Sequence, residues 1–515
     1  MKIKSVLTKP IFLLFISAIF SALPLTFSNL FILSWLAFIP FFYVVLSSDK
    51  AKLRHAIGRG FLFGFIYHAL IYYWFLWFYP LEYVNLDNAA SIGVVCLAWF
   101  GISIVHGALW CVPFILCHLT KKITQNNCFV SLVAIIGILI TQKIPQLGEL
   151  SFPWVRIALG QYKATALIQS ASIFGIDGVD TLILVINALI TISLIAKSKK
   201  RVAAILSAVI IFSANLGFGL VKTNQTHTGD SIKVLTVQAS IPTDEKWDTD
   251  GDTICYDAYS SLTKENLTDN IDLILWPESA VPKIYSSKKS LNPYKKLSDE
   301  CNTPIIAGVV LKTDKGNTNN ALLIDKDGLK STYTKRQMVP FGEYMPYQKL
   351  LSKIFPSLTK LNIIEDDYVS GKSSAIINVA GGKIGTVICF ESTYPKLSRQ
   401  STLDGAELLI EVTNDSWLED SPAMYQHLAH GVFRSIENGR YLIRSANSGI
   451  SAVIDNHGNV VSQLGANEQG VITDNVQFIE NQTLYTKTGD IFLPTLIILA
   501  LILFVIIIIK KIKAL

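Results

Sequence analysis

The sequence predicts a membrane α-helical bundle of eight spans joined to an exported α/β domain. Half of the 515 residues are hydrophobic, only 16% are charged and the mean hydropathy is +0.41, a composition too apolar for a soluble protein of this length. Apolar runs long enough to cross a bilayer, which takes about 20 residues, recur through the first 221 residues and once more at the C-terminus. From Ser231 onward, short β-branched runs separated by turn residues replace them, which is typical of a mixed α/β domain.

The apolar runs divide the chain into three regions. They fall at about 10–26, 28–47, 56–79, 89–119, 128–143, 176–197, 201–221 and 490–510. We therefore expect a seven-helix membrane domain over 1–221, a polar domain over 222–489, and a C-terminal span with a short tail over 490–515. The first run has the basic start and apolar core of a secretion signal, but more spans follow at once and no small-x-small cleavage site stands out, so we expect it to remain as a span.

Lysine and arginine are concentrated in alternate connections, which predicts the orientation of the spans because positive loops stay cytoplasmic. The intervening connections carry at most Glu82 and Asp87. This alternation places both termini in the cytoplasm and the 222–489 domain on the opposite side. The same loops explain most of the net charge of +6, so the charge gives no reason to invoke nucleic acid. The basic residues are Lys2, Lys4, Lys9, Lys50, Lys52, Arg54, Arg59, Lys121, Lys122, Lys197, Lys199, Lys200, Arg201, Lys510, Lys511 and Lys513.

The seven cysteines fall into two groups. Those in or beside apolar spans are expected to be small packing residues; they are Cys96, Cys111, Cys117 and Cys128. The other three, Cys255, Cys301 and Cys389, belong to the exported domain and lack metal-type spacing, so a free reactive thiol is expected there. The sequence leaves open whether Cys255 and Cys301 form a disulfide.

The exported domain is expected to contain one sheet or two, with helices outside. The expected helices lie at about 250–267, 293–301, 394–403 and 422–438. The expected strands are Ile232–Gln238, Ile271–Trp276, Pro304–Leu311, Ala321–Asp325, Ala375–Ala380, Lys383–Cys389, Leu408–Thr413, Tyr441–Ser445, Ile450–Asp455 and Val460–Gln463.

The stretch from Phe341 to Asp367 is too long and too apolar for an ordinary surface loop. Its apolar residues are scattered among lysines, together with Gly342, Pro346 and Pro356. We expect a mobile arm that covers the site and touches the lipid interface. The alternative is a helical insertion packed on the core.

Three segments of the exported domain carry a candidate catalytic set. Cys389 closes the apolar run Ile384–Ile388, where a strand that ends in a turn can hold a nucleophile rigidly. Glu278 ends the strand-like run Ile271–Pro277, and Lys335 opens another segment. Alone, Cys389 is better explained as a buried core cysteine. A thiol, a carboxylate and an ammonium together are sufficient for acyl transfer from an amide or ester.

In this order, the three segments resemble the catalytic segments of the nitrilase superfamily, whose sites combine Glu, Lys and Cys. The matching residues are Trp276-Pro277-Glu278-Ser279, Lys335 followed by Val339-Pro340-Phe341-Gly342-Glu343, and Ile388-Cys389-Phe390-Glu391. Seven preceding spans and one following span narrow the resemblance to the apolipoprotein N-acyltransferase family, over essentially the whole chain. Further matches are Gln238–Pro242, Lys246-Trp247, Thr413–Trp417, Gln426-His427, Glu437–Arg440 and Arg444–Gly449. The chain departs from the family at Leu418-Glu419, where Phe-Gly is usual, and at Met338, where Leu is frequent.

The resemblance implies an αββα sandwich that faces the periplasm from a bacterial inner membrane. It also implies an acyltransferase that takes an acyl chain from a phospholipid, commonly phosphatidylethanolamine, and holds it as a thioester on Cys389. The chain then passes to the N-terminal amine of diacylglyceryl-cysteine on an apolipoprotein. Glu278 would act as general base. Lys335 would lower the thiol pKa and, with the Phe390 N–H, stabilise the oxyanion. We expect no cofactor, no metal and a monomer.

Further residues surround this set. Glu343 is expected to tune protonation of the site, or else to be a polar loop residue. Glu391 flanks the nucleophile or caps its turn, and Trp247 lines the acyl or headgroup site or serves as a packing anchor. Tyr344, Pro346 and Trp417 complete the candidate substrate-binding residues.

Two histidines have a spacing that raises the question of metal binding. His427 and His430 lie three residues apart on an expected helix, but a third ligand at suitable spacing is missing. We expect them to be helix-surface or core residues.

Two other functions are compatible with parts of the sequence. The first is a membrane-anchored amidase or esterase that releases its product to water, although eight spans and an apolar arm exceed what a soluble substrate requires. The second is a transporter or receptor with an inactive exported domain, which predicts charged residues inside the spans. The main polar residues in the spans are His68 and His106, which could equally line a substrate entry.

Overall fold

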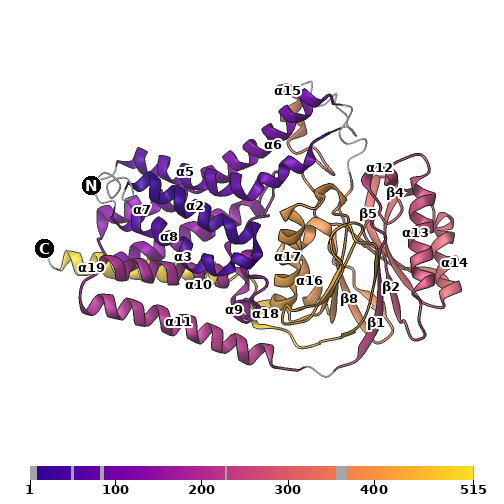
Figure 1. The fold of residues 1–515 in the computed structure, drawn as a ribbon. Helices are drawn as coiled ribbons and strands as arrows, with labels where there is room; N and C mark the ends of the chain where they lie inside the picture. Colours follow the sequence, from indigo (N-terminus) through magenta and orange to yellow (C-terminus); the bar gives the residue numbers. More distant parts are fainter. Residues whose placement is uncertain (1–8, 48–51, 82–85, 227–228, 355–367, 514–515) are drawn as a thin grey trace.

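The computed structural model describes residues 9–47, 52–81, 86–226, 229–354 and 368–513, and it consists of a helical bundle next to a β-sandwich (Figure 1). In these residues, seven helical stretches are long and apolar enough to cross a membrane, and an eighth apolar helix, α2 (Pro10–Thr26), has 17 residues. The seven stretches are Ser28–Ser47, Leu53–Phe78, Asn88–Ile123, Asn127–Gln146, Ala171–Ile195, Lys199–Thr223 and Phe492–Ile512. Each overlaps one of the expected spans.

Most of these stretches contain more than one helical element. The elements are η1 (Ser28–Leu33), α3 (Ser34–Ala37), α4 (Ile39–Ser47), α5 (Leu53–Ile71), η2 (Tyr72–Phe78), α6 (Asn88–Leu109), α7 (Cys111–Ile123), α8 (Asn127–Lys143), η4 (Ile144–Gln146), α10 (Ala171–Ile195), α11 (Lys199–Thr223) and α19 (Phe492–Ile512). The short η5 (Ile157–Gln161) and α9 (Thr165–Ile168) precede α10.

Glycines let α5 pack directly against the pair α6 and α7. A Cβ added at Gly64 would lie 2.5 Å from the Gly107 carbonyl oxygen, and one at Gly60 would lie 2.6 Å from the Trp110 carbonyl oxygen. Small residues bring helices together in this way where lipid removes the hydrophobic drive for association. Aromatic rings fill the space around the contact, with Phe63 and Trp110 centroids 4.7 Å apart.

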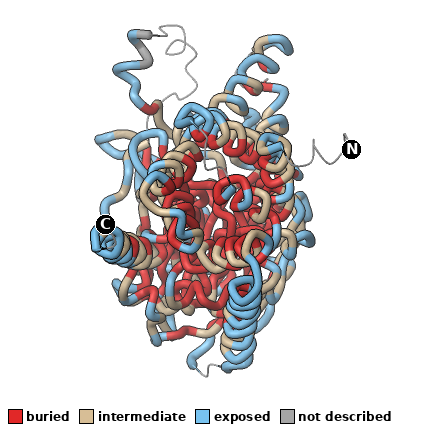
Figure 2. Tube along the Cα trace, turned by 90° about the vertical axis from the view of Figure 1, so that its left-hand side faces the viewer, coloured by how far each residue is buried: buried red, intermediate tan, exposed pale blue. Residues whose placement is uncertain are grey.

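The outer helices of the bundle are largely exposed. In the α11 and α19 windows only 22% and 11% of residues are buried, and Figure 2 shows exposed helices, including α19 at the end marked C, around a buried centre. Between their basic ends, most of the exposed side chains of these helices are apolar, among them Ile210 and Val505. Such surfaces fit lipid rather than water.

The polar domain is a sandwich of two sheets. The first has the order β13-β1-β2-β4-β5-β6, with β3 paired to β4, and the second has the order β12-β11-β10-β9-β8-β7. The strands are β1 (Ser231–Gln238), β2 (Leu273–Leu275), β3 (Ile284–Tyr285), β4 (Ile305–Thr313), β5 (Gly316–Asp325), β6 (Gly328–Thr334), β7 (Ile377–Val379), β8 (Gly382–Ile388), β9 (Leu408–Thr413), β10 (Leu442–Ala446), β11 (Ala452–Ile454), β12 (Val460–Gln463) and β13 (Gly470–Gln477).

Helices cover both outer faces, which gives the expected αββα layers (Figure 1). The inner faces share one apolar core, to which Leu275 of the first sheet and Ile410 of the second belong. Helices α13 (Gly251–Glu265) and α14 (Asn292–Cys301) pack on the first sheet. Helices α16 (Pro395–Leu403) and α17 (Pro422–Asn438) cover the second and face the bundle (Figure 1). The remaining short helices are α12 (Thr243–Lys246), α15 (Gln348–Ile354) and α18 (Leu484–Thr488).

The four expected helices of this domain are confirmed, while the strand prediction was incomplete. It missed β3, β6 and β13, and it started β5 five residues too late, at Ala321 instead of Gly316. The missed strands are short or rich in polar residues, as in Thr473-Asp474-Asn475, so they lack an apolar alternation. Pairing with a neighbour holds β13 in place, over eight residue pairs with β1.

Candidate active site

The three predicted catalytic residues lie just beyond the ends of strands from both sheets. Cys389 directly follows β8, Glu278 follows β2 and Lys335 follows β6. The turn that carries Glu278 packs tightly against β4, since a Cβ added at Gly308 would lie 2.4 Å from the Glu278 Cα. Only glycine leaves room for this approach.

Cys389 occupies a backbone conformation that non-glycine residues rarely adopt. Its φ is +53°, and such left-handed residues cost roughly 1–3 kcal/mol and persist where the surroundings over-determine them. The Glu391 carboxylate supplies much of that support. It accepts hydrogen bonds from the Ile388 and Arg336 N–H groups (2.8 and 2.6 Å) and from the Tyr333 hydroxyl (2.7 Å). A third backbone donor is Gln337 at 3.1 Å. Glu391 therefore links the turn of Cys389 to the segment of Lys335.

Lys335 lies between two carboxylates. Its Nζ is 3.1 Å from Glu278 Oε1 and 2.8 Å from Glu343 Oε1. The Asn319 side-chain amide donates to both, at 2.7 Å to Glu278 and 3.3 Å to Glu343. The second oxygen of Glu278 accepts the Asn414 N–H at 2.9 Å. The carboxylates and the ammonium are thus fixed in direct contact, with Lys335 only 1% exposed.

The protonation preferences of Lys335 and Cys389 follow from this arrangement. Burial lowers the pKa of Lys335, but the carboxylates of Glu278 and Glu343 raise it by more than burial lowers it. The resulting pKa of Lys335 is well above the usual value. Burial and the Glu278 carboxylate raise the pKa of Cys389 well above its usual value, against the opposing effect of Lys335. Lys335 does lower the pKa of the Cys389 thiol, as expected, but burial and Glu278 raise that pKa by more. These shifts favour a charged ammonium facing the carboxylates and a protonated sulfur.

A second buried network lies behind Cys389. The His427 ring lies 3.0 Å from Asp415 Oδ1 through Nδ1 and 3.1 Å from the Cys389 carbonyl oxygen through Nε2. Arg444 pairs with Asp415 and with Glu411. Both ring nitrogens of His427 and the Asp415 carboxylate are therefore already engaged.

Cys389, Asp415 and His427 are also close enough to share a metal ion, with ligand atoms within 4.8 Å of one another. A cation there would compete with the Arg444 guanidinium for Asp415. We interpret the group as a hydrogen-bond network that supports the turn of Cys389. His430 is buried as well, with Nε2 3.1 Å from the Trp154 carbonyl oxygen.

The structure places the remaining candidates around this centre in different ways. Trp417 is 42% exposed and stacks on Phe78 of the bundle, with centroids 5.7 Å apart. Tyr344 donates to the Glu149 carbonyl, and Pro346 is buried. Trp247 is 60% exposed, so it is not a packing anchor. Phe390 packs against aromatic residues of the bundle.

Two expectations concern segments away from the centre. Cys255 and Cys301 are buried free thiols, so the disulfide left open by the sequence is not formed. Of the predicted arm, residues 355–367 lie outside the described residues. The described half ends in α15, and the Tyr347 N–H donates to the Glu149 carboxylate of the bundle.

Sequence reasoning missed several residues of this site. Asn319, which holds both carboxylates, was not recognised because β5 was expected to begin only at Ala321. The signal was available in Asn317-Thr318-Asn319-Asn320, a polar run before an apolar strand. Trp154 gave no such signal, since it lies in a loop of the membrane domain far along the chain from Cys389.

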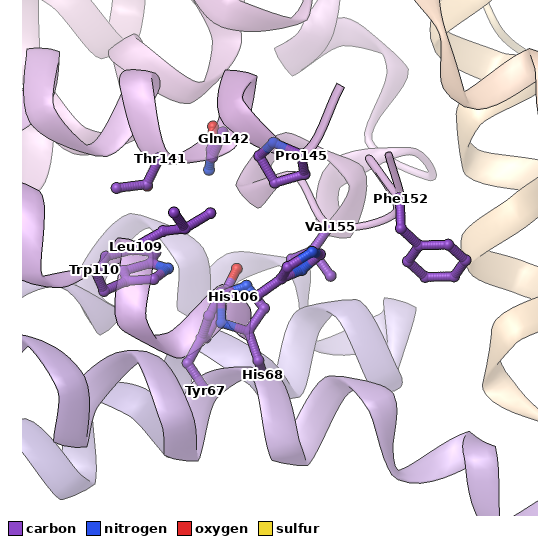
Figure 3. Close-up of a pocket in the computed structure, with 10 residues that line it drawn as sticks. All are labelled: Tyr67, His68, His106, Leu109, Trp110, Thr141, Gln142, Pro145, Phe152 and Val155. Carbon is purple, nitrogen blue, oxygen red and sulfur yellow. The ribbon is translucent and has the colours of Figure 1, made fainter. Parts of the chain in front are cut away.

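A small cavity lies inside the bundle, apart from the Cys389 centre (Figure 3). His68 and His106 line it, and Tyr67 and Gln142 carry buried polar atoms that find no partner among the described residues. The free space suffices for about one water molecule. Phe152, which also lines it, lies nearest to the catalytic domain (Figure 3).

Comparison with known proteins bears on both halves of the chain. Residues 17–189 match the model of the apolipoprotein N-acyltransferase N-terminal domain, and residues 233–483 match that of the carbon-nitrogen hydrolases. A protein named apolipoprotein N-acyltransferase from Geobacter metallireducens is 28% identical over 480 residues, which cover 89% of this chain and 88% of that one. One of the same name from Methylococcus capsulatus is 30% identical over 343 residues, 66% of each chain.

Among solved structures, a carbon-nitrogen hydrolase superfamily protein from Xanthomonas campestris aligns with 48% of this chain and 91% of its own, with 18% identity and a TM-score of 0.37. The two family models and the relatives agree on the identity of the whole chain. It belongs to the apolipoprotein N-acyltransferase family, and it is a multi-pass membrane acyltransferase with a nitrilase-like catalytic domain.

Proposed function

We propose that this enzyme moves an acyl chain from a membrane phospholipid, phosphatidylethanolamine being the expected donor, to the N-terminal amine of diacylglyceryl-cysteine on apolipoproteins. The observation that carries the proposal is the contact of Lys335 with Glu278 and Glu343 beside the strained turn of Cys389. The membrane bundle packs against the turn of Cys389, and this position fits a substrate that enters from the lipid. All three catalytic residues come from one chain, which fits a monomer.

In the first step, Glu278 takes the proton of Cys389 as the sulfur attacks the ester carbonyl of the phospholipid. The raised pKa of Cys389 makes such a base necessary. The oxyanion of the tetrahedral intermediate faces the Lys335 ammonium and the Phe390 N–H. When the intermediate collapses, the carbon–oxygen bond breaks, Glu278 returns the proton to the leaving alkoxide, and a lysophospholipid departs. The acyl chain remains as a thioester on Cys389.

In the second step, the lipoprotein amine attacks the thioester carbonyl. Glu278 takes one proton from the nitrogen, the carbon–sulfur bond breaks and the chain leaves as an amide. The proton passes from Glu278 to the Cys389 sulfur, which restores the starting state. Through both steps, the hydrogen bonds of Glu343 and Asn319 hold the side chains of Glu278 and Lys335 in position.

Mass spectrometry of the intact enzyme tests the proposal. Incubation with phosphatidylethanolamine should add one acyl mass, absent in Cys389→Ser. Addition of a diacylated lipopeptide should remove this mass and yield a triacylated peptide. Release of free fatty acid without a triacylated product would instead establish the membrane-anchored hydrolase. An unmodified Cys389 together with no release of fatty acid would contradict both activities.

We further propose eight spans, with α2 as the first, both termini in the cytoplasm and the catalytic domain in the periplasm of a bacterial inner membrane. Domain boundaries at 221 and 489 fit the end of α11 at Thr223 and the start of α19 at Phe492. Support for the orientation comes from the start of α11 and the end of α19, which lie at the bundle end away from the catalytic domain (Figure 1). Helix α11 begins at Lys199, and the last turn of α19 contains Lys510 and Lys511. Protease added to spheroplasts should cleave the catalytic domain and spare a tag after residue 515; loss of the tag would reverse the orientation.

A further inference from the structure

A loop of the membrane domain packs against the turn of Cys389. The loop lies between η4 and η5, and its residues Ser151 to Arg156 are almost entirely buried. Arg156 fastens its end by pairing with Asp177 and Asp180 of α10. At its start, the Ser151 hydroxyl accepts a hydrogen bond of 2.8 Å from Tyr394, five residues after Cys389. The loop is therefore held at both ends, once by the bundle and once by the catalytic domain.

Two rings of this loop pack on Phe390, the residue that follows the nucleophile. The Phe152 centroid lies 5.4 Å from that of Phe390 with an interplanar angle of 28°, and the Trp154 centroid lies 6.4 Å away at 17°. Phe152 and Trp154 are also near-parallel to each other, 5.6 Å apart at 11°. Such offset contacts fix ring positions as well as excluding water.

Trp154 is itself held from three directions. Its indole N–H donates to Gln426 Oε1 at 2.7 Å, and its carbonyl oxygen lies 3.1 Å from His430 Nε2. Its ring lies 5.4 Å from that of His427, whose Nε2 contacts the Cys389 carbonyl oxygen. Trp154 thus touches the neighbours of Cys389 on both sides, the Phe390 ring and the His427 imidazole, without belonging to the Glu-Lys-Cys group.

We propose that Trp154, a residue of the membrane domain, is a positioning residue for acyl transfer and acts through Phe390. This inference rests on the proposed function, because the Phe390 N–H is there an oxyanion donor. The donor can be effective only if the strained Cys389 turn keeps its place, and a displacement of about 1 Å can cost about 10²-fold in rate. The Trp154 ring restricts that displacement.

The test compares Trp154→Leu with Trp154→Phe in the full-length enzyme in detergent. The measured quantities are the single-turnover rate of acyl addition to Cys389 at saturating phosphatidylethanolamine and the concentration that gives half of that rate. Trp154→Leu should slow the rate about 10²-fold and leave the half-saturating concentration nearly unchanged. Trp154→Phe keeps a ring on Phe390 and should restore most of the rate.

Trp35 offers a matched control. It is a buried tryptophan of the membrane domain whose indole N–H donates to Gln161 Oε1 at 3.0 Å, with an edge-on contact to Phe212. Trp35→Leu should therefore lose similar packing without slowing acylation. If Trp154→Leu and Trp35→Leu acylate at the same rate, the positioning role is refuted.

Two further arms keep the result interpretable. If Trp154→Leu does not fold, Phe152→Leu takes its place with the same expectation of a lower rate at unchanged half-saturation. Since Trp154 acts through Phe390, adding Phe390→Leu to Trp154→Leu should cause little extra loss, and additive losses would contradict the route. If the wild-type enzyme gains no acyl mass at all, it is the proposed function that fails.

Discussion

At the residue scale, the strongest constraint is the position of Lys335 between Glu278 and Glu343. In the proposed mechanism, this arrangement holds the Glu278 carboxylate, as general base, in direct contact with the Lys335 ammonium, as oxyanion donor. The two ion pairs therefore fix the position of the Lys335 ammonium and of both carboxylates. Removing Lys335 would leave two neighbouring carboxylates of like charge, bridged by the Asn319 side-chain amide.

Lys335→Ala should lower the rate of acyl addition to Cys389 by about 10²–10³-fold, the usual cost of one lost oxyanion donor. Single-turnover mass spectrometry measures this rate. Lys330→Ala is the matched control, because Lys330 lies on β6, the strand that ends just before Lys335, but is exposed and pairs with Asp325 and Asp327. A Lys335→Ala rate within about threefold of the control would exclude the oxyanion role.

The reactivity of Cys389 should rise with pH. Burial and Glu278 raise its thiol pKa well above the usual value, so the reactive thiolate fraction is small at neutral pH and grows as pH approaches that raised pKa. The rate of alkylation by iodoacetamide, followed at Cys389 by peptide mass spectrometry, should increase across pH 7 to 9 without levelling off. A plateau reached below pH 7 would mean that Lys335 holds a resting thiolate.

At the element scale, the membrane domain depends on helices that approach through glycine. The contact of α5 with α6 at Gly64 and Gly107 leaves no space for a methyl group. The resulting proximity lets Phe63 and Trp110 pack as one aromatic layer. Close packing of this kind is sensitive to single added carbons.

Gly64→Ala should lower the stability of the detergent-solubilised protein by about 1–3 kcal/mol, because the new Cβ would meet the Gly107 carbonyl. Thermal unfolding measures the change. Gly58→Ala, on the same helix, meets nothing within 4 Å and should be neutral or stabilising by about 0.5–1 kcal/mol. Equal effects of the two substitutions would show that the close contact does not matter.

At the scale of the whole molecule, the bundle and the second sheet share one apolar core. That core includes Leu184 of α10 as well as Val432 of α17 and Leu409 of β9. Helix α17 therefore has an apolar environment on both sides, the sheet on one and the bundle on the other (Figure 1). The catalytic domain is completed by the membrane domain instead of merely being tethered to it.

Residues 222–489 expressed without the remaining chain should consequently expose the bundle-facing side of α17 and the Phe390 ring. The expected result is strong binding of a hydrophobic dye, self-association in sedimentation and loss of cooperative unfolding. A monomeric fragment that unfolds cooperatively and binds no dye would show that the shared core contributes little.

Short segments of the sequence were sufficient to predict much of the fold and part of the candidate site. Apolar run length predicted the membrane helices, because crossing a bilayer depends on one continuous segment. The ends of the strands at Glu278 and Cys389 were likewise readable from short apolar runs. Residues such as Asn319 and Glu391 were harder to assign, since their roles depend on which donors and charges surround them.

By itself, the sequence determined the membrane bundle, the α/β character of the polar domain and the three candidate catalytic residues, because run length, alternation and residue type act within short segments. Only the tertiary structure decided that Glu343 and Asn319 hold Lys335 and Glu278, and that Trp154 lies against Phe390. Those contacts join positions far apart in the chain, as the sequence separation of 272 between Trp154 and Gln426 illustrates. Partners of this kind are selected by the packing of two sheets against a bundle, which no local pattern encodes.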